Sequence, residues 1–255
     1  SGQANISKKF HWSEFFITPE LALGSVSTFG VHPMGGLRFV HEGVLRSSLE
    51  IKHSKKFPSM QDRYYSISGF FLGNASLKPE DVWIAHALTG SSWGWGSWSL
   101  GQYFQQRENA HVVSTDSQGV LTVKNQGVAW IYSPTLGVQL MPLKDLSMSQ
   151  DIAWVRSHVR ETGFAFPYLP EWILTSGLEY KGAFAKGRAS SSAQTGQRGQ
   201  KVGGYFYLDF GARHQFKRFN FLAQIENIFD HRRIEMVQGY YLPGRIYSFS
   251  AELSL

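Results

Sequence analysis

Residues 247–255 of the chain read YSFSAELSL, and apolar and polar side chains alternate through them without a break. A period of two indicates a β-strand with one apolar face and one polar face. A strand at the end of a chain is usually a sheet edge, and an exposed apolar edge invites aggregation unless the strand closes a barrel. The stretch is therefore either the last strand of a soluble sandwich, with its apolar face in the core, or the closing strand of a transmembrane barrel, with that face toward lipid.

The composition favours the barrel. Aromatic residues make up 15% of the chain and charged residues only 17%, against about 25% charged residues in soluble domains. Aromatic girdles are a feature of membrane barrels. The chain contains no cysteine, which excludes a disulfide framework, a thiol nucleophile and a cysteine metal site. Its net charge of +6 is spread over short basic stretches, so no nucleic-acid partner is expected.

The chain shows almost no helical periodicity and no apolar run as long as the ~18 residues of a transmembrane helix. Twelve strands are predicted instead, near 12–24, 33–42, 44–56, 81–90, 95–107, 127–141, 146–158, 170–181, 183–189, 202–216, 219–229 and 245–255. Several exceed ten residues, which suits a tilted membrane crossing of about 9–11 residues. Gln150 and Ser176 interrupt otherwise apolar faces. We predict that Leu174 and Phe210 face lipid, whereas Thr175 and Gly211 face the lumen.

Short and long connections alternate along the predicted strands. Short turns lie near 42–44, 91–94, 142–145, 181–182 and 216–219, and longer connections near 25–32, 57–80, 108–126, 159–169, 190–201 and 230–244. Outer-membrane barrels have short periplasmic turns and long external loops, whereas a Greek-key sandwich has no reason to alternate so strictly. Aromatic residues flank the short turns, as a periplasmic girdle requires; they are Trp93, Trp95, Trp98, Tyr180, Phe216 and Phe219. The predicted fold class is all-β, an antiparallel transmembrane barrel.

The segment FPSMQDRYYSISGFFLGNASLKPED (57–81) resembles TonB-dependent outer-membrane receptors. In that family a basic strand end runs into a Pro-Ser turn, an aromatic loop and an Asn-Pro-x-Leu-Lys-Pro-Glu motif. Here the motif is NASLKPE (74–80), with Ala75 where proline is common. NQGVAW (125–130) with LGVQL (136–140) is similar to the family's Asn-x-Gly strand and its Gly-Val-Glu, with Gln139 in place of glutamate.

Two further motifs lie near the C-terminus. IENIFD (225–230) looks like the family's Asn-Leu-Phe-Asp, with Ile228 for leucine, and PGR (243–245) resembles its terminal motif. The last residue is Leu255, where phenylalanine is usual, and this weakens the expected signal for the barrel assembly machinery. The four motifs follow the family's order across residues 57–255. Residues 1–56 resemble the family only in their general character.

The resemblance implies the C-terminal part of a 22-stranded barrel that an N-terminal plug domain fills. Residues 1–255 would then be barrel region, with the plug and the TonB-contacting segment outside this chain. An open sheet of twelve strands leaves backbone groups unpaired in lipid. The chain is therefore expected to be a fragment, one half of a split receptor, or a small barrel that closes on itself. The resemblance places it in the Gram-negative outer membrane, with outer-membrane lipid, a plug domain or N-terminal barrel half, and the TonB complex as partners.

The resemblance also implies active uptake of a chelated nutrient, with a ferric siderophore as the first choice of ligand, and no enzymatic activity. No catalytic, cofactor or metal site is assigned. Aromatic faces and arginines suit anionic, ring-bearing chelates, so the loop residues of these types are the candidates for ligand binding. They are Arg63, Tyr64, Tyr65, Phe70, Phe71, Phe164, Phe166, Tyr168, Tyr240 and Tyr241. The same side chains could instead pack loop against loop.

Three alternatives remain open. A small passive channel would also be a barrel of this size. An outer-membrane phospholipase would carry a His-x-Ser-Asn-Gly-type motif, which SHVRETG (157–163) approaches without the serine and the asparagine. Met60, Asp62 and His53 suggest a copper-type receptor as a variant. The nine histidines otherwise lack HxH or HExxH spacing, and neither GxSxG nor a P-loop is present.

Overall fold

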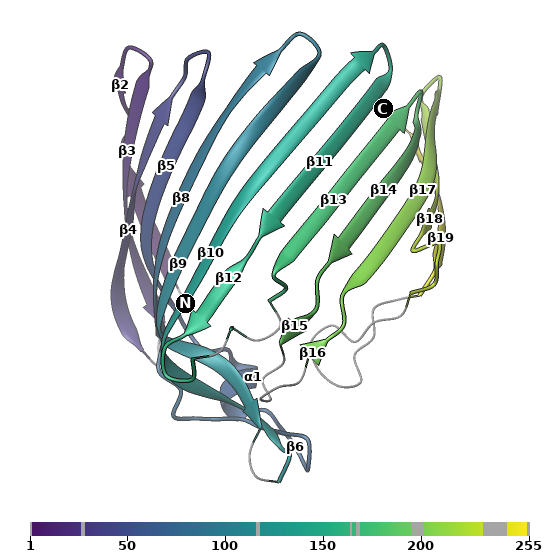
Figure 1. The fold of residues 1–255 in the computed structure, drawn as a ribbon. Helices are drawn as coiled ribbons and strands as arrows, with labels where there is room; N and C mark the ends of the chain where they lie inside the picture. Colours follow the sequence, from purple (N-terminus) through teal and green to yellow (C-terminus); the bar gives the residue numbers. More distant parts are fainter. Residues whose placement is uncertain are drawn as a thin grey trace.

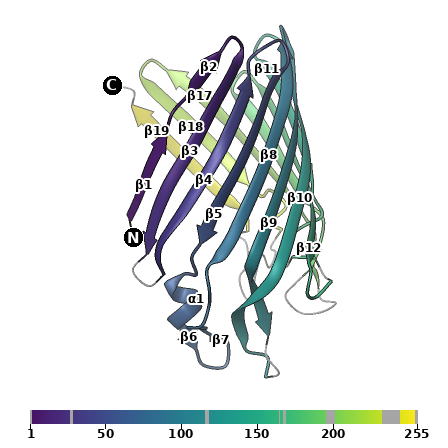
Figure 2. The same ribbon diagram turned by 90° about the vertical axis from the view of Figure 1, so that its left-hand side faces the viewer.

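The computed structural model describes residues 2–26, 29–115, 118–163, 165–166, 169–194, 201–231 and 244–253. Within these ranges, seventeen strand segments form one strongly curved sheet (Figures 1 and 2). No helix in the described part of the chain is long and apolar enough to span a bilayer.

The twelve predicted strands are all present, and each pairs antiparallel with the next. They are β3 (Phe15–Val26), β4 (Gly30–His41), β5 (Arg46–Lys56), β8 (Glu80–Trp93), β9 (Gly96–Thr115), β10 (Leu121–Leu143), β11 (Leu146–Trp154) continued by β12 (Arg156–Val159), β13 (Trp172–Tyr180), β14 (Ala183–Ser190), β17 (Tyr205–Phe216), β18 (Phe219–Glu226) and β19 (Ile246–Leu253). The remaining short elements lie in connections; they are α1 (Met60–Tyr64), β6 (Ser66–Ile67), β7 (Phe71–Leu72), β15 (Ala193–Gln194) and β16 (Lys201–Val202).

The sheet begins earlier than predicted. β1 (Gly2–Ser7) and β2 (Phe10–Trp12) both pair with β3, so the first predicted strand, near 12–24, is not the edge of the sheet. Lys8 and Lys9 interrupt the alternation of apolar and polar residues between these two strands. For this reason the pattern of the sequence does not reveal β1 and β2. The edges are therefore β1–β2 on one side and β19 on the other, and no ladder between described residues joins them.

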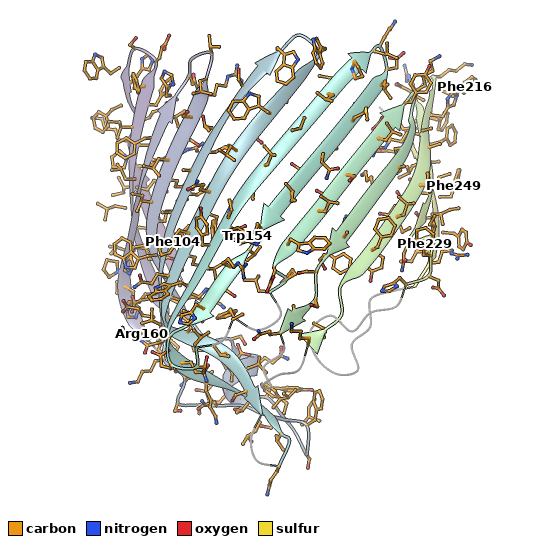
Figure 3. The ribbon with its side chains drawn as sticks, in the orientation of Figure 1. Phe104, Trp154, Arg160, Phe216, Phe229 and Phe249 are labelled. Atoms are coloured by element: carbon orange, nitrogen blue, oxygen red, sulfur yellow. The ribbon has the colours of Figure 1, made fainter. Side chains whose placement is uncertain are left out.

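The two faces of the sheet have the predicted orientation. Phe216 and Phe249 lie on the convex side (Figure 3). Phe210 shares that face with Phe216 because side chains alternate along β17, and it is 45% exposed. The register Leu174–Ala189–Phe206 places Leu174 there too. Thr175 and Gly211, one residue further along their strands, face the lumen, as predicted.

The two polar side chains that interrupt the apolar outer face form a hydrogen bond with each other. Gln150 and Ser176 are directly paired across β11 and β13. The Ser176 hydroxyl donates to Gln150 Oε1 at 2.8 Å, and Gln150 Nε2 donates to the Thr175 carbonyl at 2.8 Å. Internal pairing of this kind is what polar groups facing hydrocarbon require.

The predicted short turns share one end of the sheet and the longer connections lie at the other, although the connection at 27–29 is shorter than the turn at 42–45. The short turns share one end, the upper end in Figure 1; they are residues 13–14, 42–45, 94–95, 144–145, 181–182 and 217–218. Two predicted long loops are wrong. The connection near 25–32 is only residues 27–29, and that near 108–126 is only 116–120. The second error arises because β9 and β10 continue to lengths of 20 and 23 residues, well past the rest of the sheet.

Candidate functional site

The long-connection end of the sheet holds the candidate ligand-binding residues, and its largest described piece is the segment between β5 and β8. Ser59 caps α1, because its hydroxyl accepts from the Asp62 amide at 3.0 Å while the Asp62 carboxylate accepts from the Ser59 hydroxyl at 2.7 Å. The β6–β7 hairpin follows, and β7 adds parallel to the start of β10. The segment is therefore a folded loop with its own internal structure.

Arg63 holds this loop together. Its Nε and Nη2 donate to the Ala75 carbonyl at 3.2 and 2.7 Å. Its guanidinium also lies over the rings of Phe29, at 5.0 Å, and Tyr64, at 4.9 Å. Such contacts are typical of a structural arginine, and they leave the remaining guanidinium donors for an anionic ligand.

The aromatic candidates divide into an exposed group and a packed one. Tyr64 and Tyr65 are 54% and 51% exposed, and Phe70 is 37% exposed. Phe71 is half-buried beside Leu121. The folded loop thus gathers Arg63 and four aromatic candidates. Phe166 lies elsewhere, against the buried cluster of Ala110, Val112, Ala129 and Val159. The candidates Phe164, Tyr168, Tyr240 and Tyr241 lie outside the described residues.

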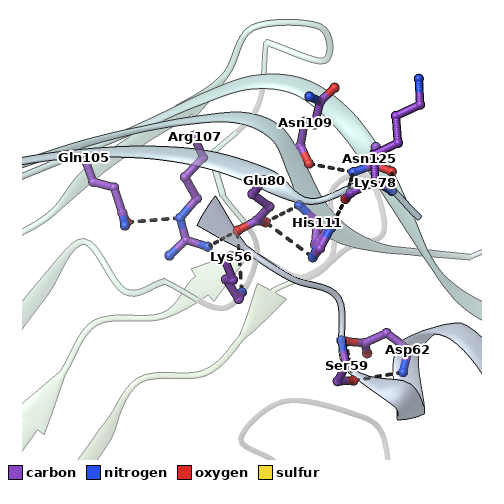
Figure 4. Close-up of polar contacts among 10 residues, drawn as sticks. All are labelled: Lys56, Ser59, Asp62, Lys78, Glu80, Gln105, Arg107, Asn109, His111 and Asn125. Atoms are coloured by element: carbon purple, nitrogen blue, oxygen red, sulfur yellow. Dashed lines mark hydrogen bonds and ion pairs between the residues drawn. The ribbon is translucent and has the colours of Figure 1, made fainter. Parts of the chain in front are cut away.

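Glu80 anchors the base of the same loop (Figure 4). Its side chain is 0% exposed, and Oε1 accepts from the His111 amide. Lys56 Nζ and Arg107 Nη1 lie 3.6 and 3.7 Å from Oε2. A buried carboxylate is costly unless it is paired and hydrogen-bonded. Here the His111 amide supplies the hydrogen bond to Oε1, and the two cations pair with Oε2 without hydrogen-bonding to it. Arg107 is itself oriented by Gln105, whose Oε1 accepts from Arg107 Nε at 3.1 Å.

The motifs at 74–80 and 125–130 meet here. Asn125 Oδ1 accepts from the Lys78 amide at 2.8 Å, and its Nδ2 donates to the carbonyls of Lys78 and Asn109 at 3.0 and 2.7 Å (Figure 4). His111 Nε2 also donates to the Lys78 carbonyl, at 2.7 Å. Asn74 donates to the Val123 carbonyl at 2.9 Å. We call these five residues, Asn74, Lys78, Glu80, His111 and Asn125, the loop clamp.

The two C-terminal motifs form a second set of contacts. Asn227 donates its amide to Asp209 Oδ1 at 2.8 Å and its Nδ2 to the His231 carbonyl at 2.9 Å. Asp230 Oδ1 accepts from the Arg245 amide at 2.8 Å. Asn227 and Asp230 have φ values of 51° and 52°, in the left-handed region that Asn and Asp tolerate best after glycine. The motif residues at both ends of the 227–245 connection therefore fix its base.

The residues behind the alternatives are not assembled into sites. Ser157 accepts from the Phe166 amide at 2.9 Å, whereas His158 stacks on Trp130 with ring centroids 5.8 Å apart. Neighbouring residues of a strand point to opposite faces, so the two do not form a catalytic pair. His53 contacts Asp81 at 3.3 Å. Within the described ranges, no group of three or more His, Asp or Glu side chains is placed to hold a metal ion.

Charged residues on the lumen wall were missed by the sequence analysis. Lys52 Nζ lies 2.7 Å from Glu50 Oε1 and 3.8 Å from Glu20 Oε2. Further along the wall, Arg213 pairs with Glu179 at 3.6 Å and lies 4.9 Å from the ring centroid of the buried Phe184. The sequence did contain a signal for them, because each of these charged residues lies on the polar face of its strand.

No family model matches the chain, and no curated protein matches its sequence. Solved structures match its fold along nearly its whole length. The copper transporter OprC matches with a TM-score of 0.77 and 14% identity over 99% of this chain and 47% of its own. A G324V mutant of the ferric enterobactin receptor PfeA from Pseudomonas aeruginosa gives 0.74 and 16%, over 98% and 44%. The siderophore receptor PirA from the same organism gives 0.69 and 16%, over 98% and 45%.

These proteins are TonB-dependent receptors. Residues 1–255 therefore have the fold of the barrel part of TonB-dependent receptors, which confirms the predicted fold class. The chain spans less than half the length of each of the three proteins.

Proposed function

We propose that this chain is the C-terminal barrel region of a TonB-dependent receptor in the Gram-negative outer membrane, and that the receptor imports a chelated nutrient. The observation that carries the proposal is the fold match over 99% of the chain. The loop clamp supports it independently, because the motifs that resemble the family in sequence contact one another in space. The solved structures with this fold are transporters and receptors. The described residues fit a protein that binds its ligand without making or breaking a covalent bond.

In this proposal the long-connection end faces the cell exterior and captures the ligand. The aromatic rings of Tyr64, Tyr65 and Phe70 stand exposed beside Arg63 on a loop that the clamp holds to β9 and β10. The charged lumen wall receives the plug, and TonB supplies the energy from the periplasm. The plug, the TonB-contacting segment and the other strands of a 22-stranded barrel would come from a region outside residues 1–255.

A ferric siderophore is the substrate class that the loop chemistry favours. Aromatic faces and an arginine suit an anionic, ring-bearing chelate, and PfeA and PirA are named as siderophore receptors. A copper substrate is the second candidate because OprC shares the fold. It has less support from the residues, since Asp62 caps α1 and His53 contacts Asp81.

Uptake by cells that carry the complete receptor tests the proposal. We expect iron-chelate-dependent growth that requires TonB, and a Tyr64→Ala/Tyr65→Ala variant with chelate binding weakened by about 5- to 150-fold, since each ring contributes ~0.5–1.5 kcal/mol. A Met60→Ala/Leu72→Ala variant, which removes two exposed apolar side chains from the same loop, should bind normally. TonB-independent uptake, or uptake of copper salts alone, would contradict the siderophore assignment.

A further inference from the structure

The short-turn end of the sheet carries a repeated lysine. Three consecutive two-residue turns join β10 to β11, β13 to β14 and β17 to β18. Their sequences with flanking residues are LKDL (143–146), YKGA (180–183) and FKRF (216–219). In each, a lysine takes the first turn position directly after an apolar or aromatic residue of the outer face; the lysines are Lys144, Lys181 and Lys217.

Two of these lysines lie against the membrane-facing ring that precedes them. Lys181 Nζ is 5.2 Å from the ring centroid of Tyr180, and Lys217 Nζ is 5.5 Å from that of Phe216. Tyr180 and Phe216 are 47% and 56% exposed on the outer face. Both ammonium groups therefore stand on the side of the sheet that faces lipid, at the level of an interfacial aromatic girdle.

The turns in the other half of the same rim, between β2 and β9, have a different composition. Its turns read Ser-Glu at 13–14, Glu-Gly-Val-Leu at 42–45 and Gly-Trp at 94–95, without a lysine. Glu14 is paired with His41 at 3.4 Å. Arg46, which follows the second turn, belongs to the lumen face opposite Gly90. Among the described turns of this rim, lysine therefore occurs only over β10 to β18, in one arc, where Arg218 adds a further cation.

We propose that Lys144, Lys181 and Lys217 form a binding arc for the phosphate headgroups of anionic phospholipids in the leaflet next to the short turns. Adjacent turns are two strand spacings apart, roughly 10 Å, so each ammonium meets a separate headgroup. Basic side chains close to a bilayer attract anionic lipid, and the outward rings of Tyr180 and Phe216 hold the Lys181 and Lys217 ammonium groups at headgroup depth. This inference goes beyond ligand uptake and requires only that the sheet crosses a bilayer.

Most exposed lysines are simply solvated, and three features distinguish Lys144, Lys181 and Lys217 from such lysines. They recur at the same turn position, they neighbour one another along the rim, and they are absent from the turns of the other half. Glu179, which lies on the lumen face two residues before Lys181, is paired with Arg213 at 3.6 Å. Asp145 follows Lys144 in the first turn and also contacts Lys181, whose amide donates to the Asp145 carbonyl at 3.1 Å. Lys217 is therefore expected to contribute most, because its turn contains no acidic residue.

The test uses the complete protein that contains these residues, purified in detergent and titrated with phosphatidylglycerol or phosphatidylcholine while bound lipid is counted by native mass spectrometry. A K144Q/K181Q/K217Q variant should lose about 100-fold in phosphatidylglycerol affinity, an average of about fivefold for each lysine, and keep its phosphatidylcholine binding. A K144R/K181R/K217R variant should retain the wild-type affinity.

The matched control removes three positive charges from the opposite end. K124Q/R160Q/K201Q changes exposed side chains at the long-connection end of the sheet and should leave phosphatidylglycerol binding unchanged. Heat-modifiability on gels confirms that each variant is folded. Equal loss in the control, or no loss in the lysine variant, would overturn the proposal. Competition by soluble glycerol phosphate as strong as that by the lipid would overturn the assignment to membrane lipid.

Discussion

Glu80 shows how one residue sets the order of a whole loop. Its carboxylate is 0% exposed and receives the His111 amide, Lys56 and Arg107. Removing this buried carboxylate leaves the mostly buried Arg107 guanidinium and the His111 amide without their partner, whereas the Lys56 ammonium is 57% exposed and stays solvated. The residues of the loop clamp are separated by 31 residues between Glu80 and His111 and by 47 between Lys78 and Asn125. Sequence motifs marked Asn74, Lys78, Glu80 and Asn125 but not His111, and they could not reveal that these residues contact one another.

Replacing Glu80 by alanine should loosen the segment 57–79 selectively. We expect a local loss of ~3 kcal/mol and faster amide hydrogen exchange in that segment, while exchange in β17 to β19 stays unchanged. The control is Glu108→Ala, which removes an exposed carboxylate from β9. Exchange as slow as in the wild type would show that the carboxylate does not hold the loop.

Gly127 offers a second test at this scale, because a Cβ there would overlap the carboxylate of Glu161. That carboxylate accepts from the Val128 amide at 3.1 Å. Gly127→Ala should displace Glu161 and expose β12 and the connection after it to proteolysis. The double variant Gly127→Ala/Glu161→Ala, which removes the clashing carboxylate, should be as resistant to proteolysis as the wild type. That result, together with a sensitive Gly127→Ala variant, would support the steric explanation. Equal protection of Gly127→Ala would contradict it.

Strands whose alternation is regular were predictable to within a few residues. β13 and β17 lie at Trp172–Tyr180 and Tyr205–Phe216, against predictions near 170–181 and 202–216. β1 and β2 were not predictable, because Lys8 and Lys9 break their pattern. The extension of β9 and β10 was missed for another reason. Beyond the bilayer neither face needs to be apolar, so the alternation that marks a membrane strand fades.

The membrane-facing register gives a prediction at this scale. Phe210→Arg should cost ~2–4 kcal/mol if the residue lies near the bilayer midplane, and Thr175→Arg should cost less because Thr175 faces the lumen. Gly211 is a poor control, since a Cβ there would meet the ring of Phe184. Denaturant titration in lipid vesicles measures both changes. A larger cost for Thr175→Arg would mean that the assigned register is wrong.

At the scale of the molecule, the sheet has two edges, β1–β2 and β19. Unpaired edges are not tolerated in lipid, so residues 1–255 produced alone should aggregate or be degraded. Together with the region that supplies the remaining strands, they should form a heat-modifiable barrel. A monodisperse pore formed by residues 1–255 alone would contradict this expectation and favour the small-channel alternative.

The central claim, that this sheet is an outer-membrane barrel whose clamped loops face the exterior, is tested most directly by labelling single cysteines on intact cells. The chain has no native cysteine, so each introduced thiol reports its own position. Ser68→Cys lies in the folded loop, and Lys144→Cys lies in a short turn. An impermeant maleimide should label Ser68→Cys on intact cells and label Lys144→Cys only after the outer membrane is opened. The reverse pattern would invert the barrel and contradict the receptor assignment.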